Sequence, residues 1–162
     1  MIRVGVVGLG KMGLSHLSMI RAHPDVRVDA VVDAAGYVLD VLEKYTGVPT
    51  FRDLETALAE VELDAVIIAT PTRLHAPMVR QALERGVSVF CEKPLCLSAE
   101  DSRDLAELAR ARGLVTQVGY HNRFVGAFQE VKRLLDLGAI GRVTHLLAEA
   151  YGPVVLRPKG ST

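Results

Sequence analysis

The residues of this chain best suited to bind a ligand form a glycine-rich turn near its start, Gly8-Leu9-Gly10-Lys11-Met12-Gly13. The turn follows the apolar run 4–7, which has the composition of a buried strand. In this spacing Gly8 permits a tight turn, Gly10 lets the backbone approach a pyrophosphate, and Gly13 lets a helix pack closely on the strand. The first N–H groups of a helix are unpaired and carry its positive dipole end. The turn therefore predicts a phosphate-binding site over all six residues.

An acidic residue lies where a dinucleotide site of this kind requires one. Asp33 comes twenty residues after Gly13 and directly follows the second apolar run, 28–32. A carboxylate at this place accepts hydrogen bonds from both hydroxyls of an adenosine ribose. Ala34 and Ala35 follow it, where a reader of a 2′-phosphate would be Arg or Ser. We therefore predict that Asp33 and Ala34 contact NAD, in preference to NADP.

A second candidate for chemistry is Glu92-Lys93-Pro94, which follows an apolar strand pattern ending at Cys91. A lysine at the carboxyl end of a strand, beside a cofactor, is a point-charge hydrogen-bond donor. When partly desolvated, it is a general acid or base. Taken alone, the tripeptide is more typical of an ordinary polar turn. Its assignment therefore depends on the order of motifs along the chain.

The elements that must position these residues alternate over the first two-thirds of the chain. Near-continuous apolar runs, typical of parallel strands covered on both faces, predict strands over 2–7, 28–32, 65–69, 87–91 and 114–118. Helical patterns lie between them, over 11–22, 36–45, 53–60, 76–85 and 99–112. This alternation predicts an α/β fold, a Rossmann-type doubly wound parallel sheet whose ligands bind at the carboxyl ends of the strands.

Two helix starts carry signals of their own. Ser98 with Asp101 three residues later resembles a capping box. Pro77 fits only the first turn of a helix, so the helix is expected to begin just before it. That leaves residues 70–75 as a loop at the carboxyl end of a strand, at the edge of the sheet where ligands bind.

The character of the chain changes after Gly119. An amphipathic helix over 124–137 and a strand over 143–151 are expected there, and one helix with one strand cannot close a core alone. We therefore interpret residues 1–119 as the nucleotide-binding domain and residues 120–162 as the start of a second α/β domain that is truncated.

Composition excludes several classes of function. Lys and Arg together number 19, as do Asp and Glu, so the net charge is zero and nucleic acid is not an expected partner. No apolar stretch is long enough to span a bilayer and no signal peptide precedes the first strand, so a cytoplasmic protein is expected. The two cysteines and five histidines show no metal-ligand spacing, so no metal is predicted.

Six motifs in order resemble the glucose-fructose oxidoreductase, inositol dehydrogenase and rhizopine-catabolism (Gfo/Idh/MocA) family over nearly the whole chain. They are the glycine turn, the acid after the second strand, Ala69-Thr70-Pro71 with His75 close behind, the segment 82–87, Glu92-Lys93-Pro94, and Gln117-Val118-Gly119-Tyr120 with Arg123-Phe124. The resemblance implies a two-domain NAD(P)-dependent oxidoreductase of sugars, cyclitols and related polyols. It also implies a homo-oligomer in the full-length form.

The resemblance implies roles for individual residues. By that likeness Thr70, Pro71, Thr72 and His75 line the nicotinamide side, with Glu92 near the ribose and substrate. Lys93 would be the catalytic lysine, and His121 lies in a stretch that contacts the nicotinamide in the family, where Asn is often followed by Arg. The family's second domain normally adds an Asp and a His a few residues apart, which this chain lacks, so the chain alone is expected to be inactive.

Two other functions fit the same residues. One is a glycoside hydrolase that oxidises and re-reduces its bound NAD in each turnover, as some members of the family do. The other is a non-catalytic NAD-binding module or redox sensor. Neither the glycine turn nor Lys93 distinguishes these from a dehydrogenase or ketoreductase.

Overall fold

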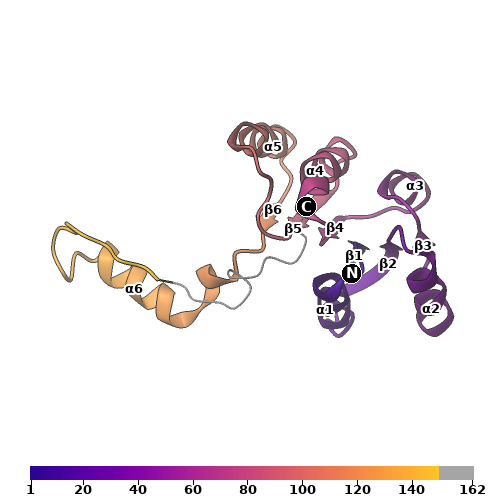
Figure 1. Ribbon diagram of the computed structural model, residues 1–162, viewed down its shortest axis with the longest axis horizontal. Coiled ribbons are helices and arrows are strands. Elements are labelled where there is room, and N and C mark those ends of the chain that lie inside the picture. Colours follow the sequence, from indigo (N-terminus) through magenta and orange to yellow (C-terminus); the bar gives the residue numbers. More distant parts are fainter. Residues whose placement is uncertain (150–162) are drawn as a thin grey trace. The chain divides into compact units, whose positions relative to one another are not determined.

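A parallel sheet of six strands organises the computed structural model, which describes residues 1–149 (Figure 1). The strand order is β3-β2-β1-β4-β5-β6 and every pairing is parallel. The strands are β1 (Ile2–Val7), β2 (Val26–Val32), β3 (Thr50–Phe51), β4 (Ala65–Ile68), β5 (Ser88–Cys91) and β6 (Thr116–Val118). The chain starts at the middle of the sheet and winds outward in both directions, which confirms the predicted doubly wound fold.

Helices cover both faces of the sheet (Figure 1). On one face lie α1 (Lys11–Arg21) and α2 (Gly36–Thr46), and on the other lie α3 (Leu54–Glu60), α4 (His75–Glu84) and α5 (Ala99–Ala111). Successive residues of a strand point to opposite faces, so Val6 packs in the cluster beneath α1 and Val7 packs in the cluster beneath α3 to α5. This two-sided burial explains why the strands read as near-continuous apolar runs.

The helix starts follow the local chemistry of the sequence. The Ser98 hydroxyl accepts a hydrogen bond from the Asp101 amide at 3.2 Å, as the capping pattern predicts. Helix α4 begins at His75, so Pro77 lies in its first turn, where no intrahelical N–H bond is lost. The predicted loop before it is short, because residues Thr72–Leu74 form a turn of 3₁₀ helix.

Two strand predictions were wrong. Strand β3 was not predicted, because its two residues, Thr50–Phe51, are too few to show a periodic pattern. A strand over 143–151 was predicted, yet residues 143–149 form no strand, and the last two residues of that prediction lie outside the described residues. An apolar run forms a strand only beside a partner, and no strand of the described residues pairs with this run.

A second compact unit begins at Tyr120, after the first unit, Met1–Gly119. It contains a 3₁₀ helix over His121–Phe124 and helix α6 (Gly126–Asp136). One side of α6 is apolar and exposed, with Phe128 and Val131 more than half accessible to solvent. An amphipathic helix of this kind is stabilised mainly by burying its apolar side against another element.

Some classes of site are not present within residues 1–149. No helix there is long and apolar enough to cross a membrane, and no group of three or more His, Cys, Asp or Glu side chains is placed to hold a metal. Cys91 and Cys96 are free thiols. Burial, with a smaller contribution from the nearby Glu92 charge, raises the pKa of the Cys91 thiol to about 12, so this thiol stays protonated and inert.

An ion pair joins Arg3, near the start of β1, to Asp64, the residue before β4. It lies where the strands begin, at the end of the sheet opposite their carboxyl ends. The Arg3 guanidinium donates to both carboxylate oxygens of Asp64, at 2.8 and 3.1 Å, and the Arg3 amide donates to the same carboxylate at 2.8 Å. These hydrogen bonds lower the pKa of Asp64 to about 2 from the ordinary value of 3.8. Because both side chains remain partly exposed, solvent screens the interaction.

We predict that Asp64→Asn makes the chain less stable near neutral pH and has little effect in strong acid. The folded-state pKa is lowered, so the stabilisation is fully present above about pH 3.8 and is lost as the pH falls toward about 2. The measurement is the urea midpoint of both proteins over a descending pH series. A midpoint difference that stays constant across this range would contradict the assignment.

Candidate functional site

The candidate residues lie at one edge of the sheet, where its strands end. The residue after each strand except β3 continues the ladder with a neighbouring strand: Gly8 donates to the Val32 carbonyl, Asp33 to Phe51, Ala69 to Val7, Glu92 to Ile68 and Gly119 to Cys91, all at 2.8–3.1 Å. Parallel strands in register thus bring five segments that are distant in sequence to one level. We call this row the carboxyl edge, and it is where open parallel sheets bind ligands.

Two of the three motif glycines are required by packing within the protein. Gly8 has φ of +88°, and an added Cβ would lie 2.9 Å from the Ala69 backbone. An added Cβ at Gly13 would overlap the Gly8 carbonyl oxygen. Helix α1 therefore lies directly against the turn that precedes it, as predicted for the first and third glycines of such a motif.

The middle glycine, Gly10, has no such requirement. Its φ of −66° is open to any residue, and no atom lies within 4 Å of where its Cβ would be. It is also the N-cap of α1 and provides no side-chain cap for the first N–H groups of the helix. The space over Gly10 and these free N–H groups fit an anionic ligand at this helix end, such as a pyrophosphate.

Asp33 is tied to the glycine turn. One of its carboxylate oxygens accepts the Leu9 amide at 2.6 Å and the other accepts the Ala35 amide at 2.8 Å. Each oxygen keeps a second lone pair, so the carboxylate can still accept hydrogen bonds from two ribose hydroxyls. Leu9 itself is a core residue, 5% exposed, so only its backbone takes part in the site.

Glu92 is held by a histidine that sequence reasoning did not assign to the site. His16 on α1 places Nε2 at 2.8 Å from Glu92 Oε1, and its ring meets the Phe90 ring edge-on at 5.1 Å. The other carboxylate oxygen of Glu92 accepts the Lys93 amide at 3.2 Å. His16 lies three residues after Gly13, on the same face of α1, and this spacing is the signal that indicates its position.

Lys93 is exposed and is the second residue after β5. Within residues 1–149 its ammonium group forms no hydrogen bond or ion pair, so it is available to a ligand above the carboxyl edge. The peptide bond between Lys93 and Pro94 is cis.

His75 is almost fully buried, at 1% exposure. Its Nδ1 lies 2.8 Å from the Pro94 carbonyl oxygen and its Nε2 lies 2.8 Å from that of Thr70. Both polar atoms of the ring therefore face backbone carbonyls, and His75 lies between the two loops that border the site. The Thr70 hydroxyl in turn contacts Met78 Sδ at 3.6 Å.

The remaining predicted residues surround the same edge or lie in the second unit. Lys11 and Met12 are exposed in the first turn of α1, and Ala34 is exposed after β2. Pro71 and Thr72 follow β4 at the start of the 3₁₀ turn. His121 is exposed at the start of a 3₁₀ helix in the second unit, and its contact with a cofactor stays a prediction.

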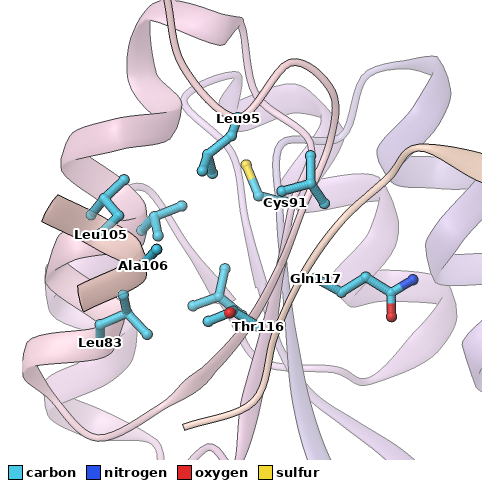
Figure 2. Close-up of a pocket in the computed structure, with 10 residues that line it drawn as sticks. Leu83, Cys91, Leu95, Leu105, Ala106, Thr116 and Gln117 are labelled. Carbon is cyan, nitrogen blue, oxygen red and sulfur yellow. The ribbon is translucent and has the colours of Figure 1, made fainter. Parts of the chain in front are cut away.

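An apolar cavity of about 160 Å³ lies elsewhere, between β5, β6 and the helices α4 and α5 (Figure 2). Figure 2 shows Leu83, Cys91, Leu95 and Leu105 around it, with Gln117 directed away from them. It contains none of the carboxyl-edge residues and no charged side chain. It therefore differs from the candidate site in both position and chemistry.

The sheet order, the close contact between Gly8 and α1, and the Asp33 carboxylate beside an open helix N-terminus together define a dinucleotide-binding domain of the Rossmann type. The comparison with known families agrees. The model of the Gfo/Idh/MocA oxidoreductase family, with its NAD-binding Rossmann fold, matches residues 2–120, and the chain belongs to this family.

Individual relatives cover several chemistries. The scyllo-inositol 2-dehydrogenase (NAD(+)) of Bacillus subtilis is 34% identical over 143 residues, 87% of this chain and 42% of the relative. The 2,7-anhydro-N-acetylneuraminate hydratase of Mediterraneibacter gnavus is 32% identical over 140 residues, 86% of this chain and 37% of the relative.

Among solved structures, scyllo-inositol dehydrogenase from Lactobacillus casei, with bound NAD(H) and scyllo-inositol, matches with a TM-score of 0.79. Its identity is 31%, over 88% of this chain and 43% of that one. The chain thus spans less than half the length of the relatives it matches.

We predict that Gly10→Ala separates ligand binding from folding. The new Cβ meets no protein atom, and the stiffer unfolded chain offsets the poorer N-cap that Ala makes, so stability changes by less than about 1 kcal/mol. The affinity for NADH falls by roughly tenfold or more. Thermal unfolding and calorimetric titration measure the two effects. The matched control is Gly13→Ala, whose Cβ overlaps the Gly8 carbonyl and lowers the unfolding temperature. Unchanged NADH affinity in Gly10→Ala would contradict a pyrophosphate at this turn.

Proposed function

We propose that this chain is the nucleotide-binding portion of an NAD-dependent oxidoreductase that acts on a hydroxyl group of a cyclitol, sugar or related polyol. The observation that carries the proposal is Gly10, a motif glycine that the fold does not need, at the open N-terminus of α1 beside Asp33. Family membership and the names of the inositol dehydrogenases among its relatives support the substrate class.

In this proposal the glycine turn and Asp33 hold the adenosine and pyrophosphate half of NAD. The N–H groups of Lys11 and Met12 face the phosphates, and Asp33 accepts the ribose hydroxyls with the lone pairs that its backbone bonds leave free. Ala34 offers no donor to a 2′-phosphate, whose charge Asp33 would also repel, so NAD is preferred to NADP.

Lys93 acts on the substrate. Bound NAD supplies the acceptor of a hydride from the carbon that carries the reacting hydroxyl, or, as NADH, the donor in the reverse direction. The Lys93 amine, which is exposed beyond the end of β5, binds that hydroxyl and takes up or returns its proton as the carbonyl forms or disappears. Thr70, Pro71, Thr72 and Glu92, with His75 behind them, border the nicotinamide and its ribose.

The second unit begins the substrate side of the enzyme in this proposal. The relatives are more than twice as long as the segment they share with this chain. We assign the rest of the substrate wall, a further acid/base pair and the contacts of a homo-oligomer to the corresponding part of the full-length protein. Residues 1–149 alone are expected to bind cofactor without turnover, because hydride transfer requires both reactants to be held in place.

A second candidate is a reaction without net oxidation, in which NAD is reduced and re-oxidised within one turnover. The similarity to a hydratase favours it, since hydration involves no net redox change. The glycoside hydrolase considered from the sequence belongs to the same class. Turnover by the full-length protein with no change in NADH absorbance distinguishes this class from a dehydrogenase.

Calorimetric titration of this chain with NAD, NADH and NADP tests the cofactor assignment. We expect NAD or NADH to bind at least about tenfold more tightly than NADP, and Asp33→Ala to weaken NADH binding by about tenfold or more. The matched control is Asp29→Ala, which removes an equal charge from β2 at a residue paired with Arg27, away from the carboxyl edge. Equal loss in both variants, or equal affinity for NADP, would contradict the assignment.

The role of Lys93 is tested in the full-length protein with NAD and a panel of cyclitols and sugars. Lys93→Ala is expected to lower kcat by about 10²–10⁴-fold while the affinity for NADH changes little, because the lysine acts on the substrate. The control is Lys44→Ala, a lysine on the outer surface of α2. Undiminished turnover in Lys93→Ala contradicts a catalytic lysine, and no turnover of any polyol by the unchanged protein contradicts the substrate class.

A further inference from the structure

The turn over residues 92–94, which we call the Lys93 turn, is held at both of its outer residues. Glu92 donates its amide to Ile68 at 2.8 Å and accepts the Lys93 amide on its own carboxylate at 3.2 Å. Pro94 presents its carbonyl oxygen to His75. Lys93 lies between them with an exposed side chain. The backbone is therefore fixed on either side of Lys93, whose side-chain amine remains available to a ligand.

The contact to Glu92 comes from the α1 face of the sheet. Nε2 of His16 lies 2.8 Å from the carboxylate, which can only accept when ionised, so this nitrogen donates. The two side chains are 14% and 13% exposed, and the His16 ring also packs edge-on against Phe90. Low exposure at both partners makes this hydrogen bond stronger and better defined than a pair on the open surface.

The contact to Pro94 comes from the other face. His75 is the first residue of α4 and is the one polar side chain among the buried residues of the described chain. Nδ1 lies 2.8 Å from the Pro94 carbonyl oxygen and Nε2 lies 2.8 Å from the Thr70 carbonyl oxygen. Carbonyl oxygens only accept, so the tautomer of the ring decides which of the two hydrogen bonds it donates. A buried polar ring costs free energy unless it is hydrogen-bonded, so the position is strongly specified.

These two contacts are independent of each other. Helix α1 packs in the cluster on one face of the sheet, with Leu17 buried there, whereas α4 packs in the cluster on the other face through Val79 and Leu83. The Lys93 turn is thus joined to the glycine-turn helix through His16 and to the loop after β4 through His75. Each histidine contacts the Lys93 turn directly, without an intervening residue.

We propose that His16 and His75 are positioning residues that hold the Lys93 turn from the two faces of the sheet, His16 through Glu92 and His75, as the tautomer protonated on Nδ1, through the Pro94 carbonyl. This inference rests on the role proposed above for Lys93. The two bonds fix the backbone on which the amine is carried and so set its distance from a hydroxyl group at the carboxyl edge. A misplacement of about 1 Å in such a group costs on the order of 10²-fold in rate.

Replacing each histidine by Asn and by Gln tests this proposal. The residue expected to keep the hydrogen bond is Asn at position 75 and Gln at position 16. The amide nitrogen of Asn takes the place of a histidine Nδ1, and that of Gln takes the place of Nε2. His75→Asn therefore keeps the bond to Pro94 and His75→Gln loses it, whereas His16→Gln keeps the bond to Glu92 and His16→Asn loses it. Helix propensity favours Gln over Asn at both sites, so it cannot produce this crossed pattern.

The first readout is hydrogen exchange of the Lys93 amide in this chain without cofactor, followed by NMR. We expect exchange to be faster by roughly tenfold or more in His75→Gln and His16→Asn, and to stay within about threefold of the unchanged chain in the other two variants. The Val89 amide, bonded to the Val115 carbonyl within the sheet, reports global opening. Exchange that rises equally at Val89, or that does not follow the crossed pattern, overturns the proposal.

The second readout is turnover by the full-length protein. The two bond-losing variants are expected to lower kcat by about tenfold or more with KM for NAD nearly unchanged, and to cause no further loss in a Lys93→Ala background. A further loss in that background shows that the histidines act elsewhere and overturns the proposal. If Lys93→Ala itself leaves turnover unchanged, the proposed function fails, whereas the exchange pattern still decides whether the two histidines hold the turn.

Discussion

The close contact between helix α1 and the turn before it is the constraint on which the rest of this structure depends. Only glycine at positions 8 and 13 allows it, because a Cβ at either place would meet backbone atoms. The contact sets the height of the α1 N-terminus above the sheet and places Leu9 where its amide reaches Asp33. It also places His16, one turn further along the helix, beside Glu92. Phosphate site, ribose site and Lys93 turn are thus linked to one packing contact.

The second organising feature is the common level at which the parallel strands end. The residue after each strand except β3 adds one bond to the same ladder, so segments that are up to about a hundred residues apart meet at the carboxyl edge. Side chains on this edge need no long loops to reach one another. The fold therefore determines where the functional site lies, whereas the residue types at the carboxyl edge determine which reaction it can perform.

Sequence patterns predicted most strands and several helix starts, because each of these depends on residues that are close together in the sequence. Apolar runs gave the long strands, and Ser98 and Pro77 marked helix starts through hydrogen bonding and steric limits. The two-residue strand β3 lacked any period to detect, and the strand expected over 143–151 lacked a partner. The spacing from Gly13 places His16 on the site face of α1, but its partner Glu92 lies 76 positions away, and the burial of His75 depends on two loops meeting, so neither contact follows from a local pattern.

The central claim is that the glycine turn and Asp33 form a working NAD site in this chain, and an NMR titration of the ¹⁵N-labelled chain with NADH tests it most directly. We predict that the amide signals of Gly10, Lys11, Met12 and Ala34 shift first and most, and that those of Glu92 and Lys93 follow as the nicotinamide half binds. Signals around the apolar cavity, such as that of Leu105, stay in place. Saturating NADH that leaves the Gly10 to Met12 amides unshifted, or that shifts only the residues around the cavity, would contradict it.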